Sequence, residues 1–165
     1  MRTQATIGDA QRLYQLLTEA SAWLRDKGIG QWNTPYPAHR FRSDIEGGRV
    51  WYWAPSGTPI ATATLREHCP EYYGPGAWAD EIAAWYISRF TVARRLAGER
   101  VGERVLAQIE ADAAGAGVQA LRLDVVASNP FLETYYVARG FRRYQAIDIF
   151  GEPAVLLEKR LGQRP

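Results

Sequence analysis

The stretch "ARRLAGERVGERVL", residues 93–106, is the junction between an apolar segment and a helix. Residues 82–93 ("IAAWYISRFTVA") are rich in β-branched and aromatic side chains, so they predict a long, mostly buried strand. After the junction, apolar side chains recur at the spacing of one helix face, and the helix is expected to end within residues 113–117. The apolar side chains are those of Val101, Val105, Leu106 and Ile109.

Two glycines and several arginines are concentrated at the start of this helix. Backbone N–H groups without partners and the positive end of the helix dipole make a helix start attractive to phosphate. Gly98 and Gly102 would let a phosphate come close to the main chain. The same residues also fit an ordinary strand-to-helix turn with a solvated arginine face, so the stretch alone leaves both interpretations open.

The elements before the junction are predicted to be one helix and a β-hairpin. Apolar side chains repeat at helical spacing from Asp9, a candidate N-cap, to Lys27. A loop rich in proline, glycine and aromatic residues follows, with a short helical piece near residues 41–46. Residues 49–54 and 59–67 have strand composition and are separated by a turn sequence, so they predict an antiparallel hairpin.

The elements after the junction complete a mixed sheet. Residues 120–127 ("ALRLDVVA") alternate apolar and charged side chains and predict a strand. Asn129 and Pro130 have the composition of a helix N-cap and first turn. Residues 141–150 and 153–161 predict a final hairpin. A strand–helix–strand unit among hairpins requires a sheet that contains both parallel and antiparallel pairs.

The composition excludes several classes of protein. With 47% hydrophobic and 23% charged side chains, residues 1–165 are expected to form a single globular domain. No apolar run approaches the roughly 20 residues of a membrane helix, so we expect a cytoplasmic protein without a membrane partner. One cysteine and two histidines offer no familiar metal-ligand spacing, and we expect no metal. A net charge of +2 does not favour nucleic acid as a partner.

A second motif lies in "ASNPFLETYYVARGF", residues 127–141. Asn129, at a helix start, is followed seven residues later by Tyr136 and then by a Gly-Phe pair. Together with "FTV" at residues 90–92 and the loop after it, this motif resembles the GNAT superfamily of acyl-CoA-dependent N-acetyltransferases. The resemblance covers residues 80–145 closely. It implies an α/β (α+β) fold with a mixed, mostly antiparallel sheet, splayed central strands and helices on both faces.

The resemblance implies acetyl-CoA as co-substrate and places it along the strand end and the loop. In the family, the main chain at positions matching Phe90 and Val92 runs beside the pantetheine arm, and a strand bulge there supplies N–H donors for the oxyanion. The family's pyrophosphate loop, Q/R-x-x-G-x-G/A, aligns to residues 97–102. The expected cofactor-binding residues are Phe90, Val92, Arg95, Ala97, Gly98, Arg100, Val101, Gly102, Asn129 and Tyr136.

The loop departs from the family pattern at two positions. Ala97 replaces the Gln/Arg, and Arg100 replaces the first motif glycine. Main-chain N–H groups can bind phosphate whatever the side chain, and Gly98 supplies flexibility just upstream. If position 100 needs a positive φ, however, an arginine there costs about 1 kcal/mol and weakens binding of the co-substrate.

Tyr136 corresponds to the tyrosine that commonly protonates the departing CoA thiolate in this family, and Asn129 to an asparagine near the pantetheine and diphosphate. A phenol, with an ordinary pKa of about 10, is a reasonable proton donor to a thiolate. The structural alternatives are a core tyrosine for Tyr136 and a simple helix cap for Asn129.

The proton of the attacking amine needs a base, and the sequence offers several carboxylates and one histidine. Glu81 and Asp80 precede the central strand, while Glu67 and His68 end the strand before it. Each of these side chains is also an ordinary solvated loop residue, and Glu81 and His68 are the candidates we retain. Cys69 is not expected to take part, because the reaction needs no cysteine nucleophile.

The expected reaction is transfer of an acetyl group to the primary amine of a small molecule by direct attack in a ternary complex. Aromatic side chains are frequent in the irregular loops and neighbouring strands, and with nearby carboxylates they suit an amine on an apolar or cationic body. These side chains include Trp32, Tyr72, Tyr73 and Trp78. The alternatives are a peptide, protein or aminoacyl-tRNA α-amine as acceptor, and a non-catalytic acyl-CoA-binding module of the same fold. The sequence also leaves open whether the protein forms a homodimer.

Overall fold

A computed structural model describes residues 1–30 and 35–162, and the chain divides into two compact units. Unit 1 comprises Met1–Leu65 and Ser88–Gln108, and unit 2 comprises Arg66–Ile87 and the chain from Ile109 onward. Each unit is therefore built from two separate stretches of sequence. Trp32, one of the aromatic residues predicted to contact the amine acceptor, lies outside the described residues.

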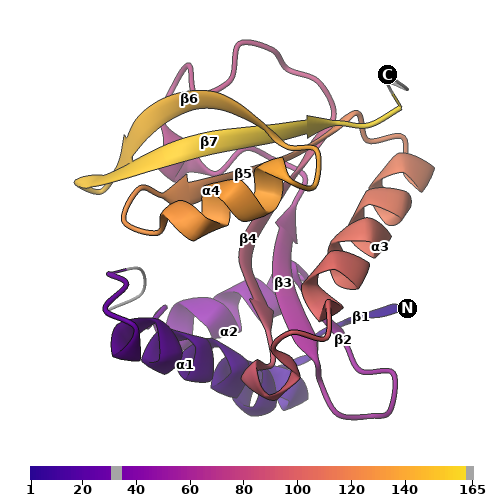
Figure 1. Cartoon of the computed structure of the whole chain (residues 1–165). Helices are drawn as coiled ribbons and strands as arrows, with labels where there is room; N and C mark the ends of the chain where they lie inside the picture. Colours follow the sequence, from indigo (N-terminus) through magenta and orange to yellow (C-terminus); the bar gives the residue numbers. More distant parts are fainter. Residues whose placement is uncertain (31–34, 163–165) are drawn as a thin grey trace. The chain divides into compact units, whose positions relative to one another are not determined.

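The strands form one seven-stranded sheet in the order β1-β2-β3-β4-β5-β7-β6 (Figure 1). Strand β4 pairs in parallel with β5 over only three residue pairs, from Ala84↔Ala120 to Tyr86↔Arg122. The pairs β1/β2, β2/β3, β5/β7 and β6/β7 are antiparallel, which confirms the predicted mixed and mostly antiparallel sheet. The strands are β1 (Arg2–Gln4), β2 (Val50–Trp53), β3 (Ala61–Arg66), β4 (Ala84–Val92), β5 (Ala120–Val126), β6 (Arg142–Ile149) and β7 (Glu152–Arg160).

Unit 1 contains helices α1 (Ala10–Asp26) and α2 (Ala38–Glu46) and the beginning of α3 (Val101–Gly115). The apolar stripe of α1 is buried against α2 and β2 through Leu13, Leu17 and their neighbours. The helix and the hairpin predicted from the sequence are thus confirmed. The Asp9 side chain, however, does not cap α1: its carboxylate instead accepts hydrogen bonds from the backbone N–H and hydroxyl of Thr6, both at 2.8 Å.

Unit 2 contains the rest of α3, helix α4 (Pro130–Val137) and the final hairpin. Asn129 lies at the N-cap position of α4 as predicted, but its side chain makes no capping hydrogen bond. The β6/β7 hairpin turns at Phe150 and Gly151, with φ of +54° and +85°. Positive φ at both turn residues is typical of a two-residue hairpin turn, so the predicted turn around Gly151 is confirmed.

Candidate functional site

The loop between β4 and α3 contains two residues in the left-handed region. Gly98 has φ of +89° and Arg100 has φ of +56°. A Cβ atom at Gly98 would meet no atom within 4 Å, so the space directly beside this residue is open. The first amides of α3 follow directly, and at a helix start such amides have no carbonyl partner in the preceding turn. These features suit a phosphate-binding loop.

Arg100 occupies the position where a motif glycine was expected, and its backbone has the conformation that favours glycine. Nothing packs around its side chain to offset the cost: 77% of the side chain is exposed, and its Nη2 pairs with Glu103 Oε2 at 2.6 Å. A surface ion pair of this kind contributes little to stability. Glu103 also places a negative charge in the first turn of α3, where it would oppose a phosphate.

Arg100→Gly is expected to raise the free energy of unfolding by about 0.5 to 1 kcal/mol, because glycine adopts positive φ without a steric penalty. The measurement is urea unfolding, with Arg100→Ala as the matched control, since alanine removes the same ion pair and keeps the strain. Equal stability of the two variants would contradict this explanation.

The other arginines of this loop are engaged within unit 1. Arg95 donates from Nη2 to the carbonyl oxygen of Pro59 at 2.9 Å, and the Arg94 guanidinium lies 3.8 Å from the centre of the Trp23 ring. Ala97 has an ordinary extended conformation, with φ of −60° and ψ of 132°. Because Arg94 and Arg95 already contact the protein, they stiffen the turn before Gly98.

Strand β4 contains a left-handed residue just before the residues matched to the pantetheine arm. Arg89 has φ of +50°, and Phe90 and Val92 follow it as half-buried residues around the buried Thr91. A left-handed residue inside a strand indicates a bulge. The family resemblance predicted a bulge near residues 90–92, and the left-handed residue lies directly before them, at Arg89.

The predicted cofactor-binding residues are divided between the two units. Those from Phe90 to Gly102 lie in unit 1, whereas Asn129 and Tyr136 lie in unit 2. Both of the latter are buried, and the Tyr136 ring makes edge contacts with Tyr135 and Phe141 at 5.2 and 5.3 Å between centroids. Burial raises the pKa of Tyr136, so its phenol stays protonated throughout the neutral range.

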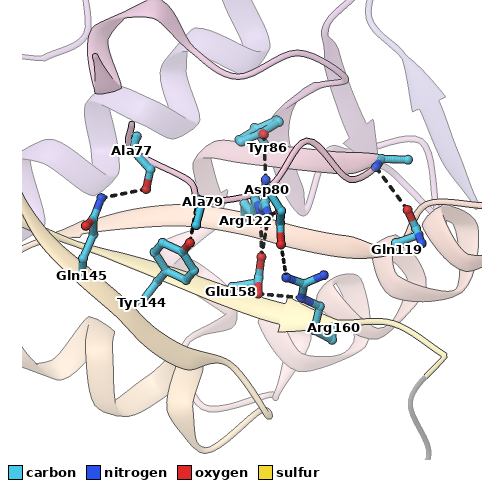
Figure 2. Close-up of polar contacts among 11 residues, drawn as sticks. Ala77, Ala79, Asp80, Tyr86, Gln119, Arg122, Tyr144, Gln145, Glu158 and Arg160 are labelled. Carbon is cyan, nitrogen blue, oxygen red and sulfur yellow. Dashed lines mark hydrogen bonds and ion pairs between the residues drawn. The ribbon is translucent and has the colours of Figure 1, made fainter. Parts of the chain in front are cut away.

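The retained base candidates, Glu81 and His68, are both exposed residues of unit 2. Their neighbour Asp80 is bound instead in an ion-pair network, shown in Figure 2. Its carboxylate pairs with Arg122 and Arg160, and the hydrogen bond from Arg122 is the main cause of its lowered pKa. A carboxylate with a lowered pKa and two cationic partners is a poor base, which removes Asp80 from the candidates.

Arg122 is the centre of this network and is fully buried, at 0% exposure. Its Nε donates to Glu158 Oε2 at 2.8 Å, its Nη1 donates to Tyr86 Oη at 3.2 Å, and its guanidinium lies 4.4 Å from the Trp78 ring centre. The alternating pattern of β5 identified Arg122 as one of the charged positions of the strand, and the structure buries its side chain completely. Partners distant in sequence cover it.

The same region fixes the segment that leads into β4 (Figure 2). The backbone N–H of Ala79 donates to Tyr144 Oη at 2.7 Å, and Gln145 Nε2 donates to the carbonyl oxygen of Ala77 at 2.7 Å. With Asp80 held by Arg122, residues 77–80 are attached to β5, β6 and β7 by side-chain contacts. Glu81 therefore follows a well-anchored segment.

Asp80→Asn is expected to lower stability at pH 7 and to have a smaller effect near pH 3. Because the folded-state pKa of Asp80 lies below its unfolded value, its ionised form stabilises the fold above about pH 4, and this contribution is lost as the pH falls further. Urea unfolding of both proteins at the two pH values measures the difference. A destabilisation that is the same at pH 3 and pH 7 would contradict this origin.

The part of the chain that the structure describes contains neither a group of metal-binding side chains nor a helix that could span a membrane. Within residues 1–30 and 35–162, no three histidine, cysteine, aspartate or glutamate side chains are grouped so that they could hold a metal ion. Over the same ranges, no helix has the length and apolar character that crossing a bilayer requires.

A family model and a curated relative both match this chain to N-acetyltransferases. Residues 11–141 match the model of the acetyltransferase (GNAT) family. The uncharacterized N-acetyltransferase YesJ of Bacillus subtilis (strain 168) is 29% identical over 142 residues, which cover 83% of this chain and 78% of that protein.

Solved structures share the fold. An acetyltransferase of the GNAT family from Streptococcus agalactiae 2603 has a TM-score of 0.80 at 19% identity, covering 99% of this chain and 96% of that one. The PaiA N-acetyltransferase from Thermoplasma acidophilum, solved in complex with coenzyme A, has a TM-score of 0.71 at 16% identity, covering 97% and 98%.

Proposed function

The chain belongs to the acetyltransferase (GNAT) family, and on that premise we propose that it transfers the acetyl group of acetyl-CoA to a primary amine of a small molecule. The observation that carries this proposal is the combination of an open, glycine-containing loop before α3 with a buried tyrosine on α4 at the spacing of the family motif. Acetyl-CoA supplies the activated thioester when bound.

The residues of unit 1 would hold the co-substrate. The N-terminal amides of α3 and the turn around Gly98 offer hydrogen-bond donors to the diphosphate, as helix starts do. The main chain of residues 90–92 would donate to the pantetheine arm and to the thioester carbonyl oxygen. Support for this assignment comes from the left-handed residues that shape both segments and from the neighbour of the same fold that was solved with coenzyme A.

The residues of unit 2 would move protons. Tyr136 would donate its proton to the sulfur of the leaving coenzyme, and its raised pKa keeps that proton in place until a thiolate forms. Glu81 or His68 would accept the proton of the attacking amine, either directly or through water.

The acceptor is proposed to be an amine on an apolar or cationic body. Tyr72, Tyr73 and Trp78 pack together in unit 2, with ring centroids 4.9 Å apart for the two tyrosines and 6.3 Å apart for Tyr73 and Trp78. Exposed carboxylates, among them Glu71 and Glu81, lie in the same stretch of sequence. Aromatic rings beside carboxylates attract ammonium groups.

Thermal melting with acetyl-CoA, CoA and 3'-dephospho-CoA tests the co-substrate. A ligand present at about 100 times its dissociation constant adds roughly 2.7 kcal/mol and raises Tm by about 5 to 10 °C for a chain of this size. A smaller rise with the dephospho form would assign arginines to the 3'-phosphate. No rise with any of the three compounds would reject the proposed function.

A further inference from the structure

Arg89 has a backbone conformation that strands rarely contain. It lies inside β4, yet its φ is +50°. Glycine usually occupies such positions, because an L side chain raises the energy of the left-handed conformation. The surrounding structure must therefore hold Arg89 in this conformation.

Three contacts within unit 1 fix the Arg89 side chain. Its Nη2 donates to Asp44 Oδ2 at 3.1 Å, and its Nε donates to Thr64 Oγ1 at 3.3 Å. Its guanidinium carbon lies 4.1 Å from the centre of the Tyr36 ring, which adds a cation–π contact. With these contacts, only 10% of the Arg89 side chain is exposed.

Asp44, the ion-pair partner of Arg89, is itself held by further contacts. It lies on α2 with 2% of its surface exposed, and it also accepts hydrogen bonds from Tyr36 Oη at 2.9 Å and Arg49 Nε at 3.1 Å. A carboxylate with several charged and polar donors is held firmly, and removal of one partner leaves an uncompensated charge. Helix α2 thus fixes a residue of β4 that is 45 positions later in the chain.

We propose that Asp44 and Arg89 are a positioning pair that keeps β4 kinked at residue 89 and so sets the direction of the amides at residues 90–92. This inference rests on the proposed function, in which those amides donate to the thioester carbonyl oxygen. Thr91 Oγ1 donates to the carbonyl oxygen of Arg89 at 3.2 Å and supports the kink locally. Without the Asp44 contact, residue 89 would return to the extended φ that side chains prefer in a strand.

The decisive comparison is Arg89→Ala against Arg89→Gly in the full chain. Both variants lose the ion pair, but only glycine keeps easy access to positive φ. We expect Arg89→Ala to lower kcat at least tenfold, with a smaller change in KM for acetyl-CoA, and Arg89→Gly to retain about five- to tenfold more activity than the alanine variant. Equal kcat values for the two variants would overturn the proposal.

Asp44→Asn and Arg49→Met separate the positioning role from the general loss of an ion pair. Both changes alter the same buried cluster, but Arg49 has no contact with β4 in the network above. Asp44→Asn should lower kcat as Arg89→Ala does, whereas Arg49→Met should reduce stability and leave kcat within about twofold. An equal fall in kcat for both variants would show a merely structural cluster and would overturn the proposal.

A readout without turnover keeps this inference distinct from the proposed function. The three-bond HN–Hα coupling of residue 89, measured by NMR on labelled protein, reports its φ directly. We expect the coupling of a left-handed residue in the wild type and of an extended residue in Arg89→Ala. An unchanged coupling would overturn the positioning pair even if the enzyme is active. If the coupling changes as expected but the protein binds no acetyl-CoA, the positioning pair is supported and only the proposed function is rejected.

Discussion

Replacement of Tyr136 by phenylalanine is expected to lower kcat about a hundredfold and to leave the affinity for CoA nearly unchanged. General acid catalysis contributes factors of about 10² to 10⁴, and the lower end applies because water can protonate a thiolate in place of a phenol. The ring contacts with Tyr135 and Phe141 do not involve the hydroxyl group, so the packing of α4 should survive the change. Steady-state kinetics with detection of free thiol, together with thermal melting in CoA, measures both quantities.

Tyr135→Phe is the matched control, because Tyr135 is the adjacent tyrosine of α4 and has no assigned role in proton transfer. Its kcat should stay within about twofold of the wild type. Since burial raises the pKa of Tyr136, any loss of activity between pH 8 and 9 must come from another group and should persist in Tyr136→Phe. Unchanged turnover in Tyr136→Phe would remove this residue as the acid.

Replacement of Arg122 by methionine is expected to cost about 3 kcal/mol of unfolding free energy. Loss of one partner from a buried ion pair costs about 3 to 5 kcal/mol, and the lower value applies because 34% of the Asp80 side chain is exposed. Methionine can fill the volume beside Trp78, but it removes the buried cation from Glu158 and leaves this carboxylate only its contact with the partly exposed Arg160. Equilibrium unfolding in urea at pH 7 gives the value directly.

Arg160→Met provides the comparison for Arg122. Arg160 pairs with the same two carboxylates, those of Asp80 and Glu158, but 37% of its side chain is exposed. Its loss should cost less than about 1 kcal/mol, because water can replace the lost contacts. Similar costs for Arg122→Met and Arg160→Met would mean that burial does not control the strength of this network.

Local patterns were sufficient to predict most of the elements. Helical spacing identified α1 and α3, and the β-rich runs around turn sequences identified both hairpins, because these signals lie within short windows of sequence. Strand β1 was not predicted, since a strand of three residues has too few positions to show a period. Its existence depends on pairing with β2, as in Thr3↔Tyr52.

The environment of single charged residues was much harder to predict. The pattern of β5 marks Arg122 as a charged position but does not show its burial, because its counter-charges, Asp80 and Glu158, are 42 and 36 positions away in the sequence. Arg100 shows the opposite case. The motif alignment raised the question of positive φ at that position, and the backbone has it, because turn geometry is set by a few neighbouring residues.

The alternation of the two units along the chain affects how the protein can fold during synthesis. All residues of unit 1 have been polymerised once Gln108 is added, before β5, α4, β6 and β7 are made. Unit 2 needs the last strands, because β5 pairs with β7 and β7 with β6. Since domains emerging from the ribosome fold in order from the N-terminus, residues 66–87 can complete their pairing and packing only after β5, and then β6 and β7, have been made. Until then Tyr72, Tyr73 and Trp78 lack later partners such as Tyr144, and aromatic side chains exposed in this way promote aggregation and bind chaperones.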